Sequence, residues 1–220
     1  GVAQGVQAAD VVILITHHHF DHVGGLDALR DTWNPVVYGP DNPAIAGIDH
    51  TLGAGDRIEV LDHLFEVLAV PGHTLDHIAY FHPADDTPLL FCGDTLFAGG
   101  CGRLFEGTPA MMHQSLQALA ALPASTRVYC AHEYTLANLA FAAAVEPGNE
   151  RLVERIARAR QSRERGAPTV PSNIALERET NPFLRCDRDE VVTGLQRQGR
   201  LEGDSVVDVF AAVRAWKDTF

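Results

Sequence analysis

One short run of the sequence strongly limits what this chain can fold into. Residues 16–22 read Thr-His-His-His-Phe-Asp-His, which places four possible metal ligands within six positions. Three more candidate ligands stand alone further along the chain, each where an expected strand gives way to a loop. The full set is His17, His19, Asp21, His22, His73, Asp94 and His132. A fold that uses this set must bring several strand ends to one place.

The spacing of these residues indicates two ion sites. Successive side chains of an extended segment point to opposite sides, so His17 and His19 can face the same way after a strand that ends at Ile15. Asp21 and His22 then lie where the loop turns into a helix and can address a second position. We therefore expect one ion at His17, His19 and His73, a second ion at Asp21, His22 and His132, and Asp94 as the bridge.

Imidazole and carboxylate ligands suit zinc, iron or manganese, so ligand type alone does not choose the metal. We expect two divalent ions, Zn²⁺ first, with Fe or Mn as alternatives. Each ion keeps an open position, which is typical of a catalytic site. A single histidine is more often structural than a ligand, and only the complete set makes the case. We expect His77 to be structural or to support a ligand, and five others to lie at the surface: His18, His50, His63, His82 and His113.

Composition excludes several classes of protein. The chain has 220 residues, of which 46% are apolar and 21% charged, as in ordinary globular proteins. No apolar stretch reaches 18 residues, so no membrane span is expected. The net charge of -12 argues against a nucleic-acid partner. The four cysteines lack paired C-x-x-C spacing, so we expect reduced thiols in a cytoplasmic protein rather than a structural zinc site. The chain begins with Gly1 in mid-pattern, as a fragment would.

The residue pattern changes from strand-like to helical near Tyr134. Short apolar runs predict strands at Val11–Ile15, Val36–Tyr38, Arg57–Leu61, Leu64–Ala69, His77–Phe81, Leu89–Cys92 and Arg127–Cys130, with a hairpin around Asp62 and His63. Helices are expected at Gly24–Asp31, Pro109–Ala121, Leu136–Val145, Glu150–Arg165 and Ser205–Lys217, with Thr108 as an N-cap and the arginines of the fourth on a solvated face. A strand-rich part therefore precedes a helical part.

The motifs resemble the metallo-β-lactamase superfamily, whose signature is T-H-x-H-x-D-H, and within it glyoxalase II, the hydroxyacylglutathione hydrolases. The supporting stretches are THHHFDHVGG at 16–25, PGHT at 71–74, GDTLFAGGCGRLFEGT at 93–108, VYCAHEYT at 128–135, VEPGN at 145–149, NPFLR at 181–185 and RAWKDTF at 214–220. The metal motif identifies the superfamily alone, whereas GCGRLFEGT and the C-terminal R-x-x-K point to glyoxalase II.

The resemblance implies an α/β fold: an αββα sandwich over residues 1–134, holding a dinuclear metal centre, and a helical domain over 135–220. It implies that Arg103, Tyr134, Arg214 and Lys217 bind glutathione. Two departures stand out. Family members begin with a further segment that includes core strands, so we expect an exposed sheet edge here. Phe105 also replaces a tyrosine that contacts glutathione in some relatives.

The expected reaction is hydrolysis of S-(2-hydroxyacyl)glutathione, such as S-D-lactoylglutathione, to glutathione and D-lactate, the second step of methylglyoxal detoxification. Two ions about 3.5–4 Å apart can share a hydroxide that attacks the carbonyl carbon, with Asp21 and Asp94 as catalytic carboxylates. A thiol of pKa about 8.5 leaves readily as an anion, so no dedicated acid is needed.

Substrate carboxylates need a local cationic patch, because screening beyond about 8 Å removes long-range attraction. Arg214 and Lys217, at i and i+3 on one helix, can supply it, with Arg103 as a third cation. We expect a monomer without nucleic-acid or membrane partners. Two alternatives stay open: a mononuclear iron enzyme of the persulfide dioxygenase type, or an inactive truncated metal-binding fragment.

Overall fold

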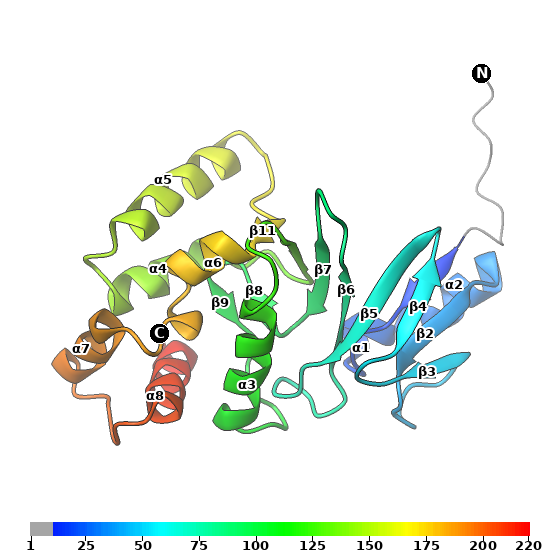
Figure 1. The fold of residues 1–220 in the computed structure, drawn as a ribbon, viewed down its shortest axis with the longest axis horizontal. Coiled ribbons are helices and arrows are strands. Elements are labelled where there is room, and N and C mark those ends of the chain that lie inside the picture. Colours follow the sequence, from blue (N-terminus) through cyan, green and yellow to red (C-terminus); the bar gives the residue numbers. More distant parts are fainter. Residues whose placement is uncertain (1–10) are drawn as a thin grey trace.

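Two β-sheets pack face to face between layers of helices in the computed structural model, which describes residues 11–220 (Figure 1). The smaller sheet has three parallel strands in the order β1-β2-β3, and the larger has six in the order β11-β10-β7-β6-β5-β4. The strand bounds are β1 Val12–Leu14, β2 Val36–Pro40, β3 His50–Leu52, β4 Arg57–Val60, β5 His63–Ala69, β6 Ile78–His82, β7 Leu89–Gly93, β10 Arg127–Cys130 and β11 Ser172–Asn173. A separate hairpin joins β8 Leu96–Phe97 to β9 Gly100–Cys101.

Alternation along the strands explains the layers, because successive side chains of a strand point to opposite faces. Val12 and Leu14 of β1 pack between the sheets, where Ile78 and Tyr80 of β6 also lie. Ile13 of β1 faces the cluster that includes Leu26 of the helix α2 (Leu26–Trp33). On the far side of the larger sheet, Ala79 and Phe81 join a third cluster with residues of the helices α3 (Pro109–Ala120) and α8 (Val206–Thr219). The expected αββα sandwich is confirmed.

Side-chain caps mark the start of four of the helices. Their bounds are α1 Phe20–Val23, α2 Leu26–Trp33, α3 Pro109–Ala120, α4 Thr135–Val145, α5 Glu150–Glu164, α6 Ile174–Thr180, α7 Asp189–Arg197 and α8 Val206–Thr219, with a 3₁₀ turn η2 at Pro182–Leu184. Thr108 caps α3 by accepting the Met111 N–H, as predicted. Ser205 and Asp208 form a capping box at the start of α8. The expected helix at 24–31 corresponds to α2, which begins and ends two residues later, and the additional short helix α1 precedes Gly24 and Gly25.

All seven predicted strands are present, but the hairpin turn lies one residue earlier than expected. Val60 pairs with His63, so the turn residues are Leu61 and Asp62, both with positive φ (50° and 66°). That conformation at both central positions is typical of a type I′ hairpin turn. The strands β3, β8, β9 and β11 and the helices α6 and α7 were not predicted, because each is too short or too irregular to show a clear period.

One hydrophobic cluster crosses from the strand-rich part to the helical part. It contains Leu90 and Val128 of the larger sheet together with Phe141, Phe183 and Phe210 of the helical part. The helical part also supplies β11, which pairs with β10. Figure 1 shows α4 to α8 gathered at the end of the larger sheet opposite β4 and β5. The division at 134/135 stays a prediction.

Two further expectations concern the surface. Among the described residues β1 pairs with β2 alone, so it forms an edge of the smaller sheet. In residues 11–220, none of the helices combines the length and the apolarity that crossing a membrane requires.

Candidate active site

All seven predicted ligands lie together at one edge of the sandwich. His17 and His19 follow β1, while Asp21 and His22 belong to α1. The other three follow strands of the larger sheet: His73 comes after β5, Asp94 directly after β7, and His132 shortly after β10. Because these strands end at the same edge, the loops that leave them converge. We call the seven residues the ligand cluster.

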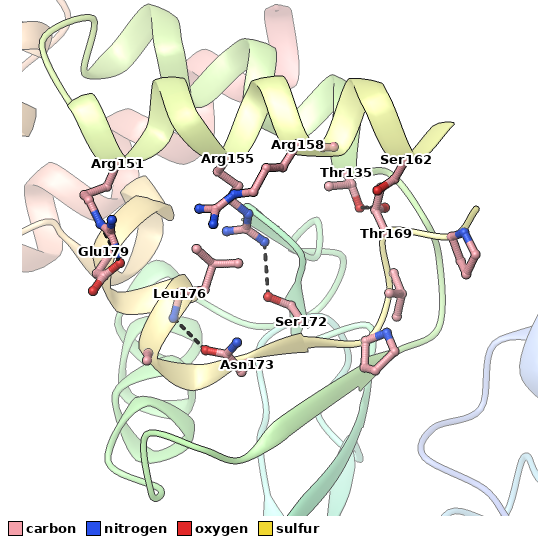
Figure 2. A pocket seen from close by; sticks show the side chains of 15 residues that line it. Thr135, Arg151, Arg155, Arg158, Ser162, Thr169, Ser172, Asn173, Leu176 and Glu179 are labelled. Carbon is pink, nitrogen blue, oxygen red and sulfur yellow. Dashed lines mark hydrogen bonds and ion pairs between the residues drawn. The ribbon is translucent and has the colours of Figure 1, made fainter. Parts of the chain in front are cut away.

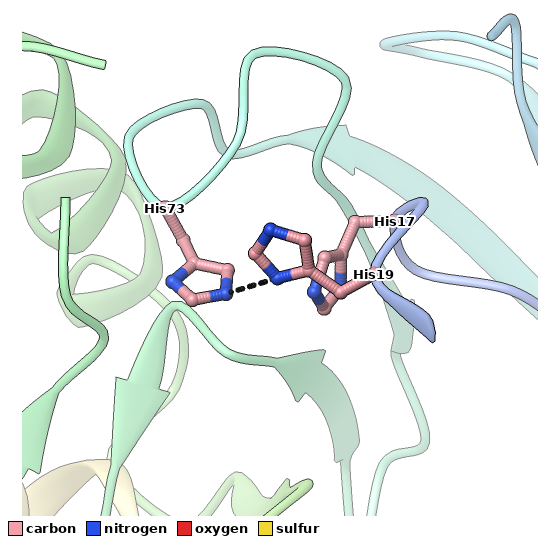
Figure 3. Close-up of side chains that lie close together, drawn as sticks. All are labelled: His17, His19 and His73. Atoms are coloured by element: carbon pink, nitrogen blue, oxygen red, sulfur yellow. Dashed lines mark hydrogen bonds between the residues drawn. The ribbon is translucent and has the colours of Figure 1, made fainter. Parts of the chain in front are cut away.

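Three imidazoles form the first half of the ligand cluster. The nitrogen atoms His19 Nδ1 and His73 Nε2 are 3.0 Å apart (Figure 3). The rings of His17 and His19 lie 4.7 Å apart and nearly perpendicular. One ring nitrogen from each of His17, His19 and His73 falls within 4.8 Å of the others. The expected first ion would meet three nitrogen donors here.

The second half brings Asp21, His22 and His132 together, and Asp94 lies between the halves. His132 Nε2 is 3.3 Å from Asp21 Oδ2. The two oxygens of Asp94 face different histidines: Oδ1 is 3.2 Å from His22 Nε2, and Oδ2 is 3.5 Å from the Nε2 atoms of both His73 and His132. A carboxylate in this position can contact ions in both halves.

Two buried atoms of the ligand cluster make no well-formed hydrogen bond: His17 Nε2, and Asp94 Oδ1, although His22 Nε2 lies 3.2 Å from the latter. A buried polar atom without a partner costs about 1–3 kcal/mol, so such atoms are rare in folded proteins. Burial lowers the pKa of His17 and of His73, which keeps both rings in the neutral form that binds metal. Donor types, convergence and the unpartnered atoms therefore fit divalent metal binding.

Supporting residues fix the orientation of the ligands. His73 Nδ1 donates to the Arg103 carbonyl at 2.7 Å, which leaves Nε2 free to face the cluster. Thr16 Oγ1 lies 3.1 Å from His17 Nδ1. His77 stacks on His17 and accepts the Asp94 backbone N–H at 3.0 Å. Burial lowers the pKa of His77 to about 3, so its ring is neutral and can accept. The expected supporting role of His77 is confirmed.

Two glycines allow the backbone around Asp94 to pack this closely. Gly93 has φ +48°, and a Cβ there would lie 2.7 Å from Thr16 Oγ1 and 2.8 Å from the His77 ring. A Cβ on Gly102 would lie 1.9 Å from the Asp94 carbonyl oxygen. Any larger residue at either position would therefore displace Asp94 or its supports.

The four predicted glutathione-binding residues line one pocket of about 310 Å³. Arg103, Tyr134, Arg214 and Lys217 share it with Phe97, Cys101, Ala137 and Asn138. Tyr134 stacks on the ring of the ligand His132, with centroids 5.1 Å apart. The pocket therefore adjoins the ligand cluster, and we call it the cationic pocket.

Asp218 belongs to this pocket's charge balance and was missed by sequence reasoning. Its Oδ1 accepts from Arg103 Nε and from Arg214 Nη2, each at 3.1 Å. The i, i+4 spacing of Arg214 and Asp218 on α8 was the signal that could have revealed it. Arg214 is only 6% exposed and also donates to the Cys101 carbonyl. Burial, and then the neighbouring Arg214 charge, lower the pKa of Lys217. Asp218 pairs with Arg103 and Arg214, whereas Lys217 forms no ion pair within the described residues.

A larger cavity, of about 590 Å³, lies away from the ligand cluster, between α5, α6 and residues 168–173 (Figure 2). None of the seven ligands lines it. The other arginines of this helix are exposed, as expected, but Arg155 in the wall of this cavity is an exception. Arg155 is 4% exposed and pairs with Glu177, which is fully buried. The predicted surface position of His18 is also wrong in part, since this half-buried ring contacts Asp76 Oδ1 at 2.9 Å.

Comparison with known proteins agrees with both parts of the site. Residues 10–132 match the family described as "Metallo-beta-lactamase superfamily", and residues 133–220 match "Hydroxyacylglutathione hydrolase C-terminus". The hydroxyacylglutathione hydrolase of Pseudomonas aeruginosa strain PAO1 is 58% identical over 208 residues, covering 94% of this chain and 80% of the relative. That of Chromohalobacter salexigens is 54% identical over 209 residues, with the same coverage of both chains.

Solved structures share the fold. ETHE1 from Myxococcus xanthus aligns with a TM-score of 0.59 at 27% identity, over 95% of this chain and 77% of its own. TTHA1623 in a di-iron-bound form aligns with a TM-score of 0.54 at 27% identity, over 79% of this chain and 77% of its own. With two family matches that together span residues 10–220 and relatives above half identity, the chain belongs to the hydroxyacylglutathione hydrolase (glyoxalase II) family of the metallo-β-lactamase superfamily.

Proposed function

We propose that this protein hydrolyses the thioester bond of S-(2-hydroxyacyl)glutathione, with S-D-lactoylglutathione as substrate, to give glutathione and a 2-hydroxy acid. The observation that carries the proposal is the adjacency of the ligand cluster and the cationic pocket. Tyr134 lines the pocket and stacks on the ligand His132. A thioester carbonyl can therefore reach the ligand cluster while the glutathione part occupies the pocket.

We propose two divalent ions, with Zn²⁺ the expected metal. The first would be held by His17, His19 and His73, the second by Asp21, His22 and His132, and both by Asp94. When bound, such ions supply a water molecule of lowered pKa and polarise the carbonyl oxygen. Iron remains an alternative, since the similar structure TTHA1623 is described in a di-iron-bound form.

The chain's own residues have separate roles in this proposal. Asp94 holds its carboxylate between the two halves, and Asp21, whose Oδ2 faces His132, adds a second carboxylate to the second half. No side chain is needed to protonate the leaving group, because a thiol of pKa about 8.5 leaves as thiolate. Arg103, Arg214 and Lys217 would bind the glutathione carboxylates, and Tyr134 would contact the peptide.

The dioxygenase-type alternative is less well supported. The second half of the ligand cluster, Asp21, His22 and His132, is complete, whereas a mononuclear iron enzyme needs one set of ligands. The curated relatives at 58% identity are named hydroxyacylglutathione hydrolases and match along nearly the whole chain. We also propose a monomer in the cytoplasm, a location in which the four free thiols would stay reduced.

The test is hydrolysis of S-D-lactoylglutathione by the metal-loaded protein, followed as loss of the thioester absorbance, with the metal content measured on the same sample. Lys217→Ala tests the pocket best, because Arg214 is buried and its loss would also disturb packing. Losing one charged contact costs about 1.5–3 kcal/mol, so KM should rise about tenfold or more with kcat little changed. Arg160→Ala, an exposed change on α5, is the control. Metal-loaded protein without thioesterase activity would refute the function, and an unchanged KM in Lys217→Ala would refute the role of the pocket.

A further inference from the structure

The β8–β9 hairpin of the strand-rich part is held in place by residues of the helical part. Its turn contains Ala98 and Gly99, the latter with φ +73°. Three helical-part side chains contact the turn backbone: Asn138 of α4, Glu177 of α6, and Asn181 just after α6. The hairpin is therefore tethered by segments that lie about 40 to 80 positions away in the sequence.

Glu177 is the centre of this tether. Its side chain is fully buried, and each carboxylate oxygen has a different task. Oε1 accepts from Arg155 and Ser172, which anchors the carboxylate to the helical part (Figure 2 shows Arg155 reaching Ser172). Oε2 accepts the Gly99 N–H at 2.8 Å and the Asn181 amide at 3.0 Å. The Glu177 carboxylate therefore accepts a hydrogen bond from one backbone N–H of the hairpin.

Asn181 completes the tether on the acceptor side of the turn. Its Nδ2 also donates to the Gly100 carbonyl at 2.9 Å, while its Oδ1 caps the η2 turn by accepting from Phe183 N. Glu177 and Asn181 together therefore bind the N–H of Gly99 in the turn and the carbonyl of Gly100 at the start of β9. A charge-assisted, fully buried arrangement of this kind permits little movement.

The tethered hairpin connects the ligand cluster to the cationic pocket. It begins two residues after Asp94 and ends two residues before Arg103. The ring centroid of Phe97 in β8 lies 5.5 Å from that of Tyr134 and 6.1 Å from that of the ligand His132. The carbonyl oxygen of Cys101 in β9 accepts a hydrogen bond from Arg214 Nη1 at 3.1 Å. Movement of the hairpin would displace both walls of the cationic pocket, whereas Asp94 is separately held by His77.

We propose that Glu177, with Asn181, is a positioning pair that sets the shape of the cationic pocket through the β8–β9 hairpin. The role in substrate binding rests on the proposed function, but the tether itself does not. Loosening the pair should weaken glutathione binding, because the pocket walls shift. It should leave the metal content unchanged, because the ligands have their own supports.

Two variants and one control test this pair in the full-length, metal-loaded protein. Glu177→Gln removes the charge from the centre of the tether. In that variant the buried Arg155 charge loses its counter-charge, which can prevent folding, so Asn181→Ser is the second variant. It removes the Nδ2 contacts with the Gly100 and Phe97 carbonyls and with Glu177, and it keeps a side chain able to cap η2. Ser172→Ala is the control, because it removes a contact to the same carboxylate on the side away from the hairpin.

Amide hydrogen exchange tests the tether without assuming any activity. Peptides covering residues 96–101 should exchange at least tenfold faster in Asn181→Ser than in Ser172→Ala, while peptides covering 16–25 stay unchanged. Equal exchange of the hairpin in the two proteins would overturn the tether.

Binding of S-methylglutathione, measured by calorimetry, tests the consequence. The dissociation constant and the KM for the thioester should both rise about tenfold in Asn181→Ser, with kcat within twofold and the metal content unchanged. Faster hairpin exchange with unaltered binding would overturn the positioning role. A wild-type protein that binds S-methylglutathione but hydrolyses no thioester would refute the proposed function and leave the binding test of the pair intact.

Discussion

The ligand cluster and the group formed by Arg155, Ser172, Glu177, Thr180 and Asn181 are both buried and polar, yet their hydrogen bonding differs. We call the second group the Arg155–Glu177 cluster. Both oxygens of Glu177 accept two hydrogen bonds, and Arg155 also donates to Thr180 at 2.7 Å. In the ligand cluster, His17 Nε2 makes no hydrogen bond, and Asp94 Oδ1 has only the His22 ring nitrogen near it, at 3.2 Å and without a well-formed hydrogen bond.

This difference separates a structural cluster from one that needs another component. Burying polar groups without partners is costly, so a complete cluster can be explained by folding alone. An incomplete one, made of neutral imidazoles and a carboxylate, gains its missing contacts from metal ions. Hydrogen-bond completeness, rather than burial or charge, therefore indicates which of the two clusters carries chemistry.

The largest expected effect comes from Asp94→Asn in the ligand cluster. The amide keeps the size of the side chain but loses the charge that faces three histidines. Metal stabilisation is worth several kcal/mol, so kcat/KM for the thioester should fall about 10³-fold or more, together with the metal content. Steady-state kinetics and elemental analysis check this. Full metal loading and activity in the variant would show that the unpartnered Asp94 oxygen has no ligand role.

Arg155→Met tests the other side of the comparison. Removing one partner of a buried ion pair costs about 3–5 kcal/mol, so the free energy of unfolding should fall by that amount while the folded fraction keeps its metal. Replacing both partners, Arg155→Met with Glu177→Leu, should be less destabilising than the single change, because no charge stays buried alone. Urea denaturation gives both values. A loss of metal from folded Arg155→Met would contradict a purely structural role for this arginine.

His77→Gln addresses the supports of the ligand cluster. His77 accepts the Asp94 N–H and stacks on His17, so its loss should let both ligands move. Residues that support ligands typically change metal affinity or activity by about 10–100-fold. Metal titration of the metal-free protein measures the affinity directly. An affinity within twofold of the wild type would mean that the ligands hold their places without this ring.

The smallest effects come from removing one hydroxyl near each cluster. Ser172→Ala should lower the free energy of unfolding by about 1 kcal/mol with no change in metal affinity. Thr16→Val, which removes the oxygen beside His17 Nδ1, should instead lower metal affinity about tenfold. Thermal unfolding and metal titration of both variants compare the two clusters, since each variant loses one hydroxyl group. The reverse pattern would break the distinction drawn from hydrogen bonding.

Local pattern was enough to predict the main strands and to select the candidate ligands. The continuous apolar run from Val12 to Ile15 marks a strand with two covered faces, and the candidate ligands His17 and His19 follow it in the loop. The motifs around His17, His73, Asp94 and His132 carried the resemblance to the superfamily, that resemblance implied the αββα layers, and the family match agrees.

Other features depended on partners far along the chain. The strand β11 has two residues and exists because it pairs with β10, some 45 positions earlier. The burial of Arg155 depends on Glu177, which nothing in the α5 sequence reveals, and the helical spacing of α5 favoured a solvated face instead.

The sequence by itself determined which residues could bind metal, because ligand chemistry and strand periodicity are local properties. Only the tertiary structure decided which buried charged groups have all their hydrogen bonds and where each cation lies in the cationic pocket. It also decided that Asp218 offsets part of the positive charge of that pocket. Those properties depend on distances between atoms of separate elements, and such distances exist only once the sheets and helices have packed.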